Sequence, residues 1–144
     1  METAKKDLSY FRLRLQELLN TSFPEKAHDQ KFIEQRSKWA ANAYDSAFRL
    51  GNSIVQCDHI ADHILFEGLH FSPFDTVFQV VCNEFDTIMA DEALRPFALK
   101  MLPVCRSLFA NSEQTDDFAY GEAYDLLYTE ITGTIQTWIE EHGI

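Results

Sequence analysis

Two histidines, His59 and His63, come nearest in this sequence to a metal-binding or catalytic motif. Four residues apart, they share one side of a helix and could bind the same metal ion, with Asp62, Glu67 and His70 as further candidate ligands. No glutamate separates them as in a His-Glu-x-x-His motif, and helical spacing places both away from the apolar stripe of their segment. We therefore favour an ordinary solvated helix face. The alternative is a weak metal-dependent enzyme that uses His59 and His63.

The segment Glu67-Gly-Leu-His70 has the Glu-x-x-His spacing of di-iron helix bundles, which need a second copy and two more glutamates. This sequence has no second copy, and Gly68 is expected to end the helix inside the motif. Nucleophile elbows and glycine-rich phosphate loops are also absent from the sequence. We therefore expect no catalytic residue, no cofactor and no metal.

The three cysteines, Cys57, Cys82 and Cys105, are odd in number and widely spaced, with no Cys-x-x-Cys pair. This pattern favours small buried hydrophobic residues over disulfides, zinc ligands or reactive thiolates. The N-terminus carries no apolar secretion signal, and no apolar run is long enough to cross a membrane. We expect a cytoplasmic protein that does not insert into membranes.

Arg36 falls within the predicted apolar stripe of its helix, between Phe32 and Trp39. Arginines in such positions are normally paired with acidic groups or extend their charged end to solvent. We expect a structural arginine that either extends its charge to solvent or pairs with an acidic group, and a carboxylate such as Glu84 or Asp125 against its guanidinium would exclude a functional role. Anion recognition is the functional alternative.

Charge is unevenly distributed along the 144 residues, which hold 12 Lys and Arg against 23 Asp and Glu and carry a net charge of −11. Residues 1–50 contain nine basic and seven acidic residues, a net of +2, whereas residues 51–144 contain three and sixteen, a net of −13. Residues 30–67 resemble a helix-turn-helix, but the would-be recognition helix has no Lys or Arg. Phosphate repulsion argues against direct nucleic-acid binding.

Hydrophobic periodicity and capping residues predict six helices that must position these side chains. They cover residues 8–22, about 30–50, about 53–67, a segment that begins at Pro73, about 92–110 and about 122–141. The expected inward residues of the second helix are Phe32, Trp39, Ala40, Ala43, Ala47 and Leu50, and those of the third are Ile54, Cys57, Ile60, Ala61, Ile64 and Leu65.

The later helices are expected to bury residues as far as Ile88 and Met89 in the fourth, Val104 and Leu108 in the fifth, and Trp138 in the sixth. Pro96 and Pro103 fall on the solvent side of the fifth helix, which we expect to bend or to break near Pro96. Gly133 indicates a kink or a close backbone approach. The predicted fold is all-α, a single compact bundle of about six helices that forms one domain over residues 1–144.

Several blocks of the sequence resemble a small family of Bacteroidetes proteins of unknown function. They are Leu8-Ser-Tyr-Phe, Ile64-Leu-Phe-Glu-Gly-Leu-His-Phe-Ser72, Asn83-Glu-Phe85, Leu102-Pro-Val-Cys105, Asp116-Asp-Phe-Ala119, Leu126-Leu-Tyr-Thr-Glu-Ile-Thr-Gly-Thr-Ile135 and Gly143-Ile144. The resemblance implies an association with conjugative and other mobile elements, and it implies no activity or catalytic residue.

The function that we expect is that of a non-enzymatic accessory protein acting by protein-protein interaction through a helical surface. Its aromatic content of 13%, with 12 Phe, supports this expectation, as do Val55 and Phe66, which fall outside the apolar stripe of their helix. A partner protein or a homodimer is expected, since a weakly basic first third can face an acidic remainder in a second copy. The further alternative is an acidic nucleic-acid mimic or anti-defence protein with carboxylates along one face.

Overall fold

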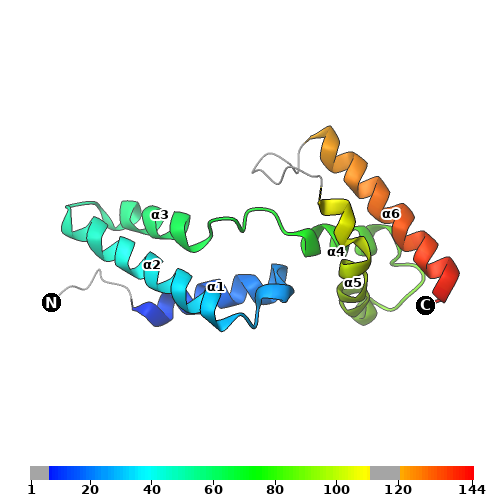
Figure 1. The fold of residues 1–144 in the computed structure, drawn as a ribbon, viewed down its shortest axis with the longest axis horizontal. Coiled ribbons are helices and arrows are strands. Elements are labelled where there is room, and N and C mark those ends of the chain that lie inside the picture. The colour runs from blue at the N-terminus through cyan, green and yellow to red at the C-terminus, as the bar shows by residue number, and fades with distance from the viewer. Residues whose placement is uncertain (1–6, 111–120) are drawn as a thin grey trace. The chain divides into compact units, whose positions relative to one another are not determined.

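A computed structural model describes residues 7–110 and 121–144 of the chain (Figure 1). Six α-helices and two short 3-10 helices make up the regular structure of these residues, so the predicted all-α fold is confirmed. The chain divides into two compact units, Met1–Leu69 (unit 1) and His70–Ile144 (unit 2), each with its own apolar core. The single domain over residues 1–144 stays a prediction. The block from Asp116 to Ala119 lies outside the described residues.

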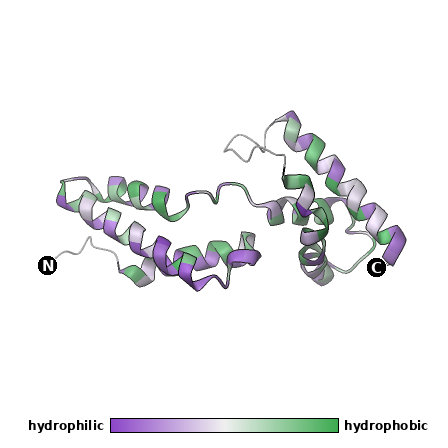
Figure 2. Cartoon of the chain, in the orientation of Figure 1, coloured by the Kyte–Doolittle hydropathy of each residue, from purple (hydrophilic) through white to green (hydrophobic). Residues whose placement is uncertain are grey.

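Unit 1 consists of α1 (Leu8–Ser22), the 3-10 helix η1 (Pro24–Lys26), α2 (Gln30–Arg49) and α3 (Ile54–Leu65). Helix α2 packs against both α1 and α3. Figure 2 shows the apolar and polar residues alternating along each helix, as amphipathic helices require. The unit 1 core contains Phe11, Leu15, Leu19, Ile33, Ala40, Tyr44, Ala47, Cys57, Ala61 and Leu65, with Phe23, Ala27 and Leu69 at its edge.

Local capping explains where α2 and α3 begin, and a glycine turn follows α3. The Asp29 side chain accepts a hydrogen bond from the Phe32 amide at the start of α2, and Ser53 and Gln56 form a reciprocal capping box at the start of α3. Gly68 has φ of +80°, the left-handed conformation that glycine adopts without strain, and Leu69 after it is buried. The predicted turn at Gly68 is thus confirmed.

The buried face of α2 differs from the prediction. Its fully or nearly fully buried residues are Ile33, Ser37, Ala40, Tyr44 and Ala47, whereas Trp39 is 51% exposed and Leu50 is 83% exposed. The actual stripe, with steps of four and three residues, carries small side chains that let α1 and α3 approach α2 closely. Tyr44 fills the space between them. The predicted face followed the large apolar residues of α2, and it lies beside the face that is actually buried.

Helix α3 buries only a narrow stripe of residues spaced by four, namely Cys57, Ala61 and Leu65. Two residues that were expected in the core are exposed: Ile54 by 51% and Ile60 by 39%. The expectation that Val55 lies outside the stripe is confirmed, since it is also exposed. Because α3 has only one helical neighbour that it packs against extensively, a single narrow stripe suffices.

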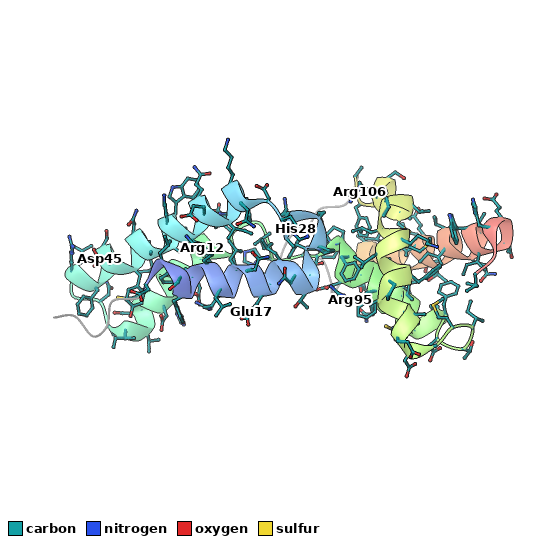
Figure 3. All side chains as sticks on the ribbon, turned by 90° about the horizontal axis from the view of Figure 1, so that it is seen from below. Arg12, Glu17, His28, Asp45, Arg95 and Arg106 are labelled. Carbon is teal, nitrogen blue, oxygen red and sulfur yellow. The ribbon has the colours of Figure 1, made fainter. Side chains whose placement is uncertain are left out.

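Ion pairs connect the three helices of unit 1. Arg12 of α1 contacts Glu34 of α2 at 2.6 Å (Figure 3 labels Arg12), and Arg14 of α1 contacts Asp62 of α3, also at 2.6 Å. Both pairs are partly exposed, which limits each to about 1 kcal/mol or less. The apolar core therefore supplies most of the stability, and the ion pairs help to fix how α1 sits against the other two helices.

Unit 2 consists of α4 (Pro73–Glu84), α5 (Asp91–Cys105), the 3-10 helix η2 (Arg106–Phe109) and α6 (Glu122–His142). Helix α4 packs against α5 and α6, and α5 packs against α6. The side chain of Ser72 caps α4 through the Asp75 amide at 2.9 Å, with Pro73 in the first turn, as the sequence predicts. The core is built from Phe74, Val77, Val80, Val81, Leu94, Phe97, Ala98, Met101, Leu102, Cys105, Phe109, Leu127, Ile131 and Ile135.

The prolines of α5 face solvent, as the sequence predicts, and of the two predicted alternatives, a bend or a break near Pro96, only the break is wrong. Pro96 and Pro103 are both exposed, but α5 runs through Pro96 without a break and gives way to the 3-10 helix only after Cys105. Helix α4 also ends earlier than predicted, at Glu84, which leaves Ile88 48% exposed in the connection to α5. A side chain outside a helix no longer follows the helical spacing that predicted its burial.

Candidate interaction groove

The candidate metal ligands do not form a complete site. His59 and His63 are exposed on α3, and Asp62 between them accepts a hydrogen bond from Arg14. Helix α3 ends at Leu65, so Glu67 and His70 both lie beyond it and do not share a helical face. Over residues 7–110 and 121–144, no three His, Cys, Asp or Glu side chains are grouped closely enough to hold a metal ion.

Arg36 binds backbone carbonyls at the end of α3. Its Nη1 atom donates to the carbonyl oxygen of Glu67 at 2.6 Å and lies 3.4 Å from the carbonyls of Ile64 and Leu65. The Ile64 and Leu65 carbonyls belong to the last turn of α3, where a helix carries partial negative charge, and Glu67 lies just beyond it. The structural interpretation of Arg36 thus holds, with backbone carbonyls as its partners.

Two cysteines of unit 2 are poor nucleophiles: Cys105, which is buried as predicted, and Cys82, which is only partly buried. Burial raises the pKa of the Cys105 thiol to about 11, and the pKa of Cys82 is also raised, by burial first and then by Asp86 and Asp91. A thiol with such a pKa carries almost no thiolate near neutral pH. These two residues therefore fill space in unit 2 and are unsuited to covalent catalysis.

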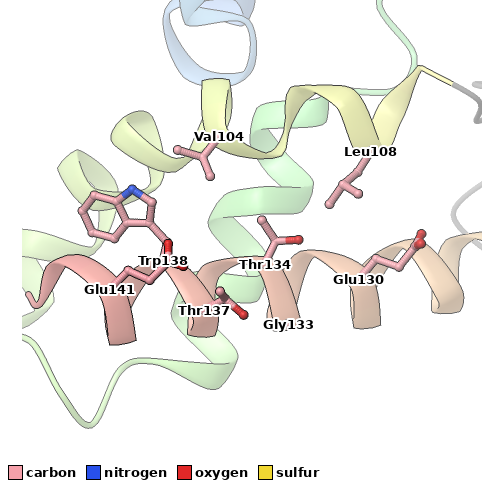
Figure 4. Close-up of a pocket in the computed structure, with 8 residues that line it drawn as sticks. All are labelled: Val104, Leu108, Glu130, Gly133, Thr134, Thr137, Trp138 and Glu141. Atoms are coloured by element: carbon pink, nitrogen blue, oxygen red, sulfur yellow. The ribbon is translucent and has the colours of Figure 1, made fainter.

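A groove in unit 2 is the surface with the clearest binding chemistry. It lies between the C-terminal end of α5, η2 and α6, is open to solvent and has a volume of about 560 Å³. Val104 and Leu108 point toward α6 from one side, and Thr134 and Trp138 point back from the other (Figure 4). The rest of the lining also comes from α6: Glu130, Gly133, Thr137 and Glu141.

Gly133 has no side chain, so part of the groove is bare: the backbone of α6 is exposed there. Helix α6 continues through this glycine, and a Cβ atom built on it would meet no atom within 4 Å. The predicted close backbone approach is therefore wrong within the described part of this chain. Since glycine inside a helix costs about 1 kcal/mol relative to alanine, the exposed backbone at Gly133 is a feature that folding alone does not require.

Trp138 forms a rigid aromatic wall of the groove. Its ring meets Phe97 edge-on at 6.0 Å between centroids and stacks on His142 at 4.5 Å. The Lys100 ammonium lies 5.5 Å from the Trp138 ring centroid, within the range of a cation-π interaction. Contacts on several sides hold the indole in one orientation, so a binding partner would lose little entropy in ordering it.

Polar contacts between α4 and α6 position the helix that carries most of the groove. The Tyr128 hydroxyl donates to Glu84 at 2.9 Å and accepts from the Asn83 amide at 3.2 Å, and the Tyr124 hydroxyl donates to Gln79 at 3.1 Å. Burial, followed by the neighbouring Glu84, raises the pKa of Tyr128, so this phenol stays protonated as a donor. Together with the buried Leu127, Ile131 and Ile135, these bonds fix the rotation of α6.

The groove has an acidic rim within an acidic unit. Glu130 and Glu141 are exposed at its two ends along α6. The sequence of residues 70–144 contains thirteen Asp and Glu and only three Lys and Arg. Two of those three cations, Arg95 and Lys100, lie over aromatic rings. The third, Arg106, is exposed on η2. Although Lys100 lies beside the Trp138 wall of the groove, the excess of acidic residues in unit 2 favours a positively charged partner.

Comparison with known proteins places the chain in a family. The family model described as Domain of unknown function (DUF1896) matches residues 3–144. The chain belongs to this family. No curated protein matches, so the DUF1896 assignment brings no activity with it. The resemblance to a Bacteroidetes family of unknown function is confirmed to this extent.

A solved structure is similar to this DUF1896 chain over nearly its full length. It is the crystal structure of protein PG0816 from the Bacteroidetes species Porphyromonas gingivalis. The two sequences are 39% identical, the match covers 98% of this chain and 96% of the PG0816 chain, and the TM-score is 0.89.

None of the helices in the described segments is both long enough and apolar enough to span a membrane.

The groove was not predicted from the sequence, although one signal pointed to it. Gly133 stands out within a helical pattern, and Thr134 and Thr137 follow it as small side chains on nearby positions of the same helix. The sequence pattern of α6 does not predict which residues form the opposite wall of the groove. Val104 and Leu108 were expected to be buried, whereas Val104 is 36% exposed and both line the groove.

Proposed function

We propose that this DUF1896 protein is a non-enzymatic cytoplasmic accessory protein that binds another protein through the groove between α5, η2 and α6. The observation that carries the proposal is the combination of an apolar wall, a bare glycine and carboxylates at both ends. An amphipathic helix with basic residues flanking its apolar face fits this combination, since apolar side chains enter a groove while charges outside it select the partner.

The dimensions of the groove support a helical ligand. Glu130 and Glu141 are eleven residues apart on α6, which corresponds to about 16 Å at 1.5 Å per residue, or three turns of a bound helix. Gly133, Thr134 and Thr137 are small, so the backbone of a partner helix can approach α6 closely. An open groove with few converging polar groups suits such a surface better than it suits a small molecule.

Two further parts of the proposal concern cellular context. The free thiols of Cys57, Cys82 and Cys105 support a reducing compartment such as the cytoplasm. The family resemblance supports a role in conjugative or other mobile elements. If that role is right, genes for DUF1896 proteins will recur within such elements, and a survey of their gene neighbourhoods tests this.

A synthetic helix tests the groove directly. The probe is a fluorescently labelled amphipathic peptide of roughly 15 residues, built from Leu, Ala and Lys, with a scrambled peptide of the same composition as control. Fluorescence anisotropy with the full chain should show binding of the amphipathic peptide and at least tenfold weaker binding of the scrambled one. Equal binding of both peptides would show that only net charge is recognised and would overturn the proposal.

A pair of variants on α6 locates the binding surface. Gly133→Met places a long side chain in the bare part of the groove, where an added Cβ meets no atom within 4 Å, and should weaken peptide binding at least tenfold. Gln136→Met introduces the same side chain at an exposed position of α6 that does not line the groove, and should bind as the unmodified chain does. If both variants bind equally well, the groove is not the binding site.

A further inference from the structure

The outward face of α2 carries lysines and a tryptophan, whereas the groove of unit 2 has glutamates at its ends. Lys31, Gln35, Lys38, Trp39 and Asn42 lie along this face and, with Glu34, line a shallow hollow of about 640 Å³. Trp39 is 51% exposed although it is one of only two tryptophans in the chain. Large exposed aromatic residues flanked by cations are typical of residues that anchor a protein interface.

The buried side of α2 leaves this face available. Helix α2 packs on α1 and α3 through Ile33, Ser37, Ala40, Tyr44 and Ala47. Lys31 and Lys38 are seven residues apart, two helical turns, and therefore extend from the same side about 10 Å apart along the axis. Glu34 on the same face pairs with Arg12 at 2.6 Å and lies 3.9 Å from the Lys38 ammonium, so the two lysines leave this aromatic face with a small positive excess.

The two surfaces carry opposite charges, and flexible side chains can bridge the difference in their lengths. The groove has Glu130 and Glu141 about 16 Å apart along α6, and the flexible side chains of Lys31 and Lys38 can extend outward from their spacing of about 10 Å to reach them. Between the lysines and Asn42, the half-exposed Trp39 supplies apolar surface for the bare backbone at Gly133 and the wall made by Val104 and Leu108.

We propose that the groove of unit 2 binds the outward face of α2 from a second copy of this chain. This inference rests on the proposed function, because it names the helix that occupies the same groove. When each copy places its α2 in the groove of the other, the two contacts are equivalent and the assembly closes as a two-fold dimer. Self-association is then driven by apolar burial at Trp39 and guided by lysine-glutamate pairing.

Charge reversal tests the pairing in both directions. Sedimentation velocity over a concentration series should show a monomer-dimer equilibrium for the unmodified chain. Lys31→Glu with Lys38→Glu, or Glu130→Lys with Glu141→Lys, should each weaken the dimer at least tenfold because like charges then meet at both contacts. An equimolar mixture of the two variants should recover the dimer, since each contact again joins opposite charges.

Matched controls exclude effects of net charge alone. Glu17→Lys with Glu25→Lys reverses two exposed carboxylates of unit 1 and should leave the dimer unchanged. Trp39→Ala should weaken the dimer, yet keep the far-UV circular dichroism and, at a concentration where the unmodified chain is monomeric, the melting temperature, because Trp39 is half exposed and lies outside the core.

Three outcomes would overturn the inference. They are a chain that stays monomeric at its highest soluble concentration, a dimer that both charge-reversed variants retain, and a mixture that fails to recover the dimer lost in each variant. The peptide assay separates this failure from that of the proposed function. A monomeric chain whose groove still binds the amphipathic peptide has a different partner, whereas loss of both activities removes the groove as a binding site.

Discussion

Replacing Gly133 with alanine should stabilise the protein. Gly133 lies in the interior of α6, where glycine is about 0.8–1 kcal/mol less favourable than alanine. The added Cβ would meet no atom within 4 Å, so neither a clash nor a new buried contact changes that figure. The backbone at Gly133 is not left-handed, since positive φ angles among the glycines are found only at Gly51, Gly68 and Gly143. The expected gain is about 1 kcal/mol at 25 °C.

The shift in melting temperature depends on which part of the chain unfolds together. With an unfolding entropy of about 2.1 cal/mol/K per residue, 1 kcal/mol corresponds to about 6 °C if unit 2 unfolds by itself and about 3 °C if all 144 residues unfold as one. Thermal and urea denaturation followed by far-UV circular dichroism at low protein concentration measure both quantities.

The control for this experiment is Gln136→Ala, at an exposed position of the same helix. Because glutamine and alanine both favour the helix, this substitution should change stability by less than about 0.5 kcal/mol. A Gly133→Ala variant as stable as the unmodified chain, or less stable, would refute the reasoning. It would mean that the space beside Gly133 is filled in solution or that the α6 backbone there is not helical.

Three more predictions concern the contacts that hold each unit together. Arg36→Gln should destabilise unit 1 by about 1–2 kcal/mol, because the C-terminal carbonyls of α3 lose a charged donor, and urea denaturation of this variant beside Arg36→Lys measures the loss. Arg14→Met and Asp62→Asn, alone and combined, should give a coupling energy below about 1 kcal/mol that declines with added salt; a salt-independent coupling would contradict a partly exposed ion pair. The unfolding free energy should fall between pH 9 and 11, because the Cys105 thiol has a pKa of about 11 when folded and about 9 when unfolded, so the unfolded chain loses its proton first. The variant Cys105→Ala should show a smaller decline. An unchanged slope would contradict the assignment of this decline to Cys105.

Helix ends were predictable because the signals that set them are local. The Ser72-Pro73 start, the Gly68 turn and the exposed positions of Pro96 and Pro103 all agree with the structure. Each depends on backbone conformation or on hydrogen bonds between residues a few positions apart. The buried residues of α6, namely Leu127, Ile131 and Ile135, recur every four positions and form one narrow stripe.

The face that a helix buries was less predictable where two apolar faces compete. Helix α2 offered one face with Trp39 and Leu50 and another with Ser37, Ala40 and Tyr44, and burial selected the second. Hydropathy favoured the larger residues, but close packing depends on whether volumes fit between the neighbouring helices. The same limit applied to Arg36, whose partners are backbone carbonyls brought near by the packing of α3 on α2.

The sequence by itself determined an acidic, all-helical chain and where most of its helices begin and end, because composition and capping are properties of neighbouring residues. Only the tertiary structure decided that the apolar residues form two separate cores and that α5, η2 and α6 enclose a groove. Gly133 lies far from Val104 and Leu108 in the chain and shares the groove with them through packing. A binding surface of this kind depends on which faces meet, and local sequence patterns do not encode that choice.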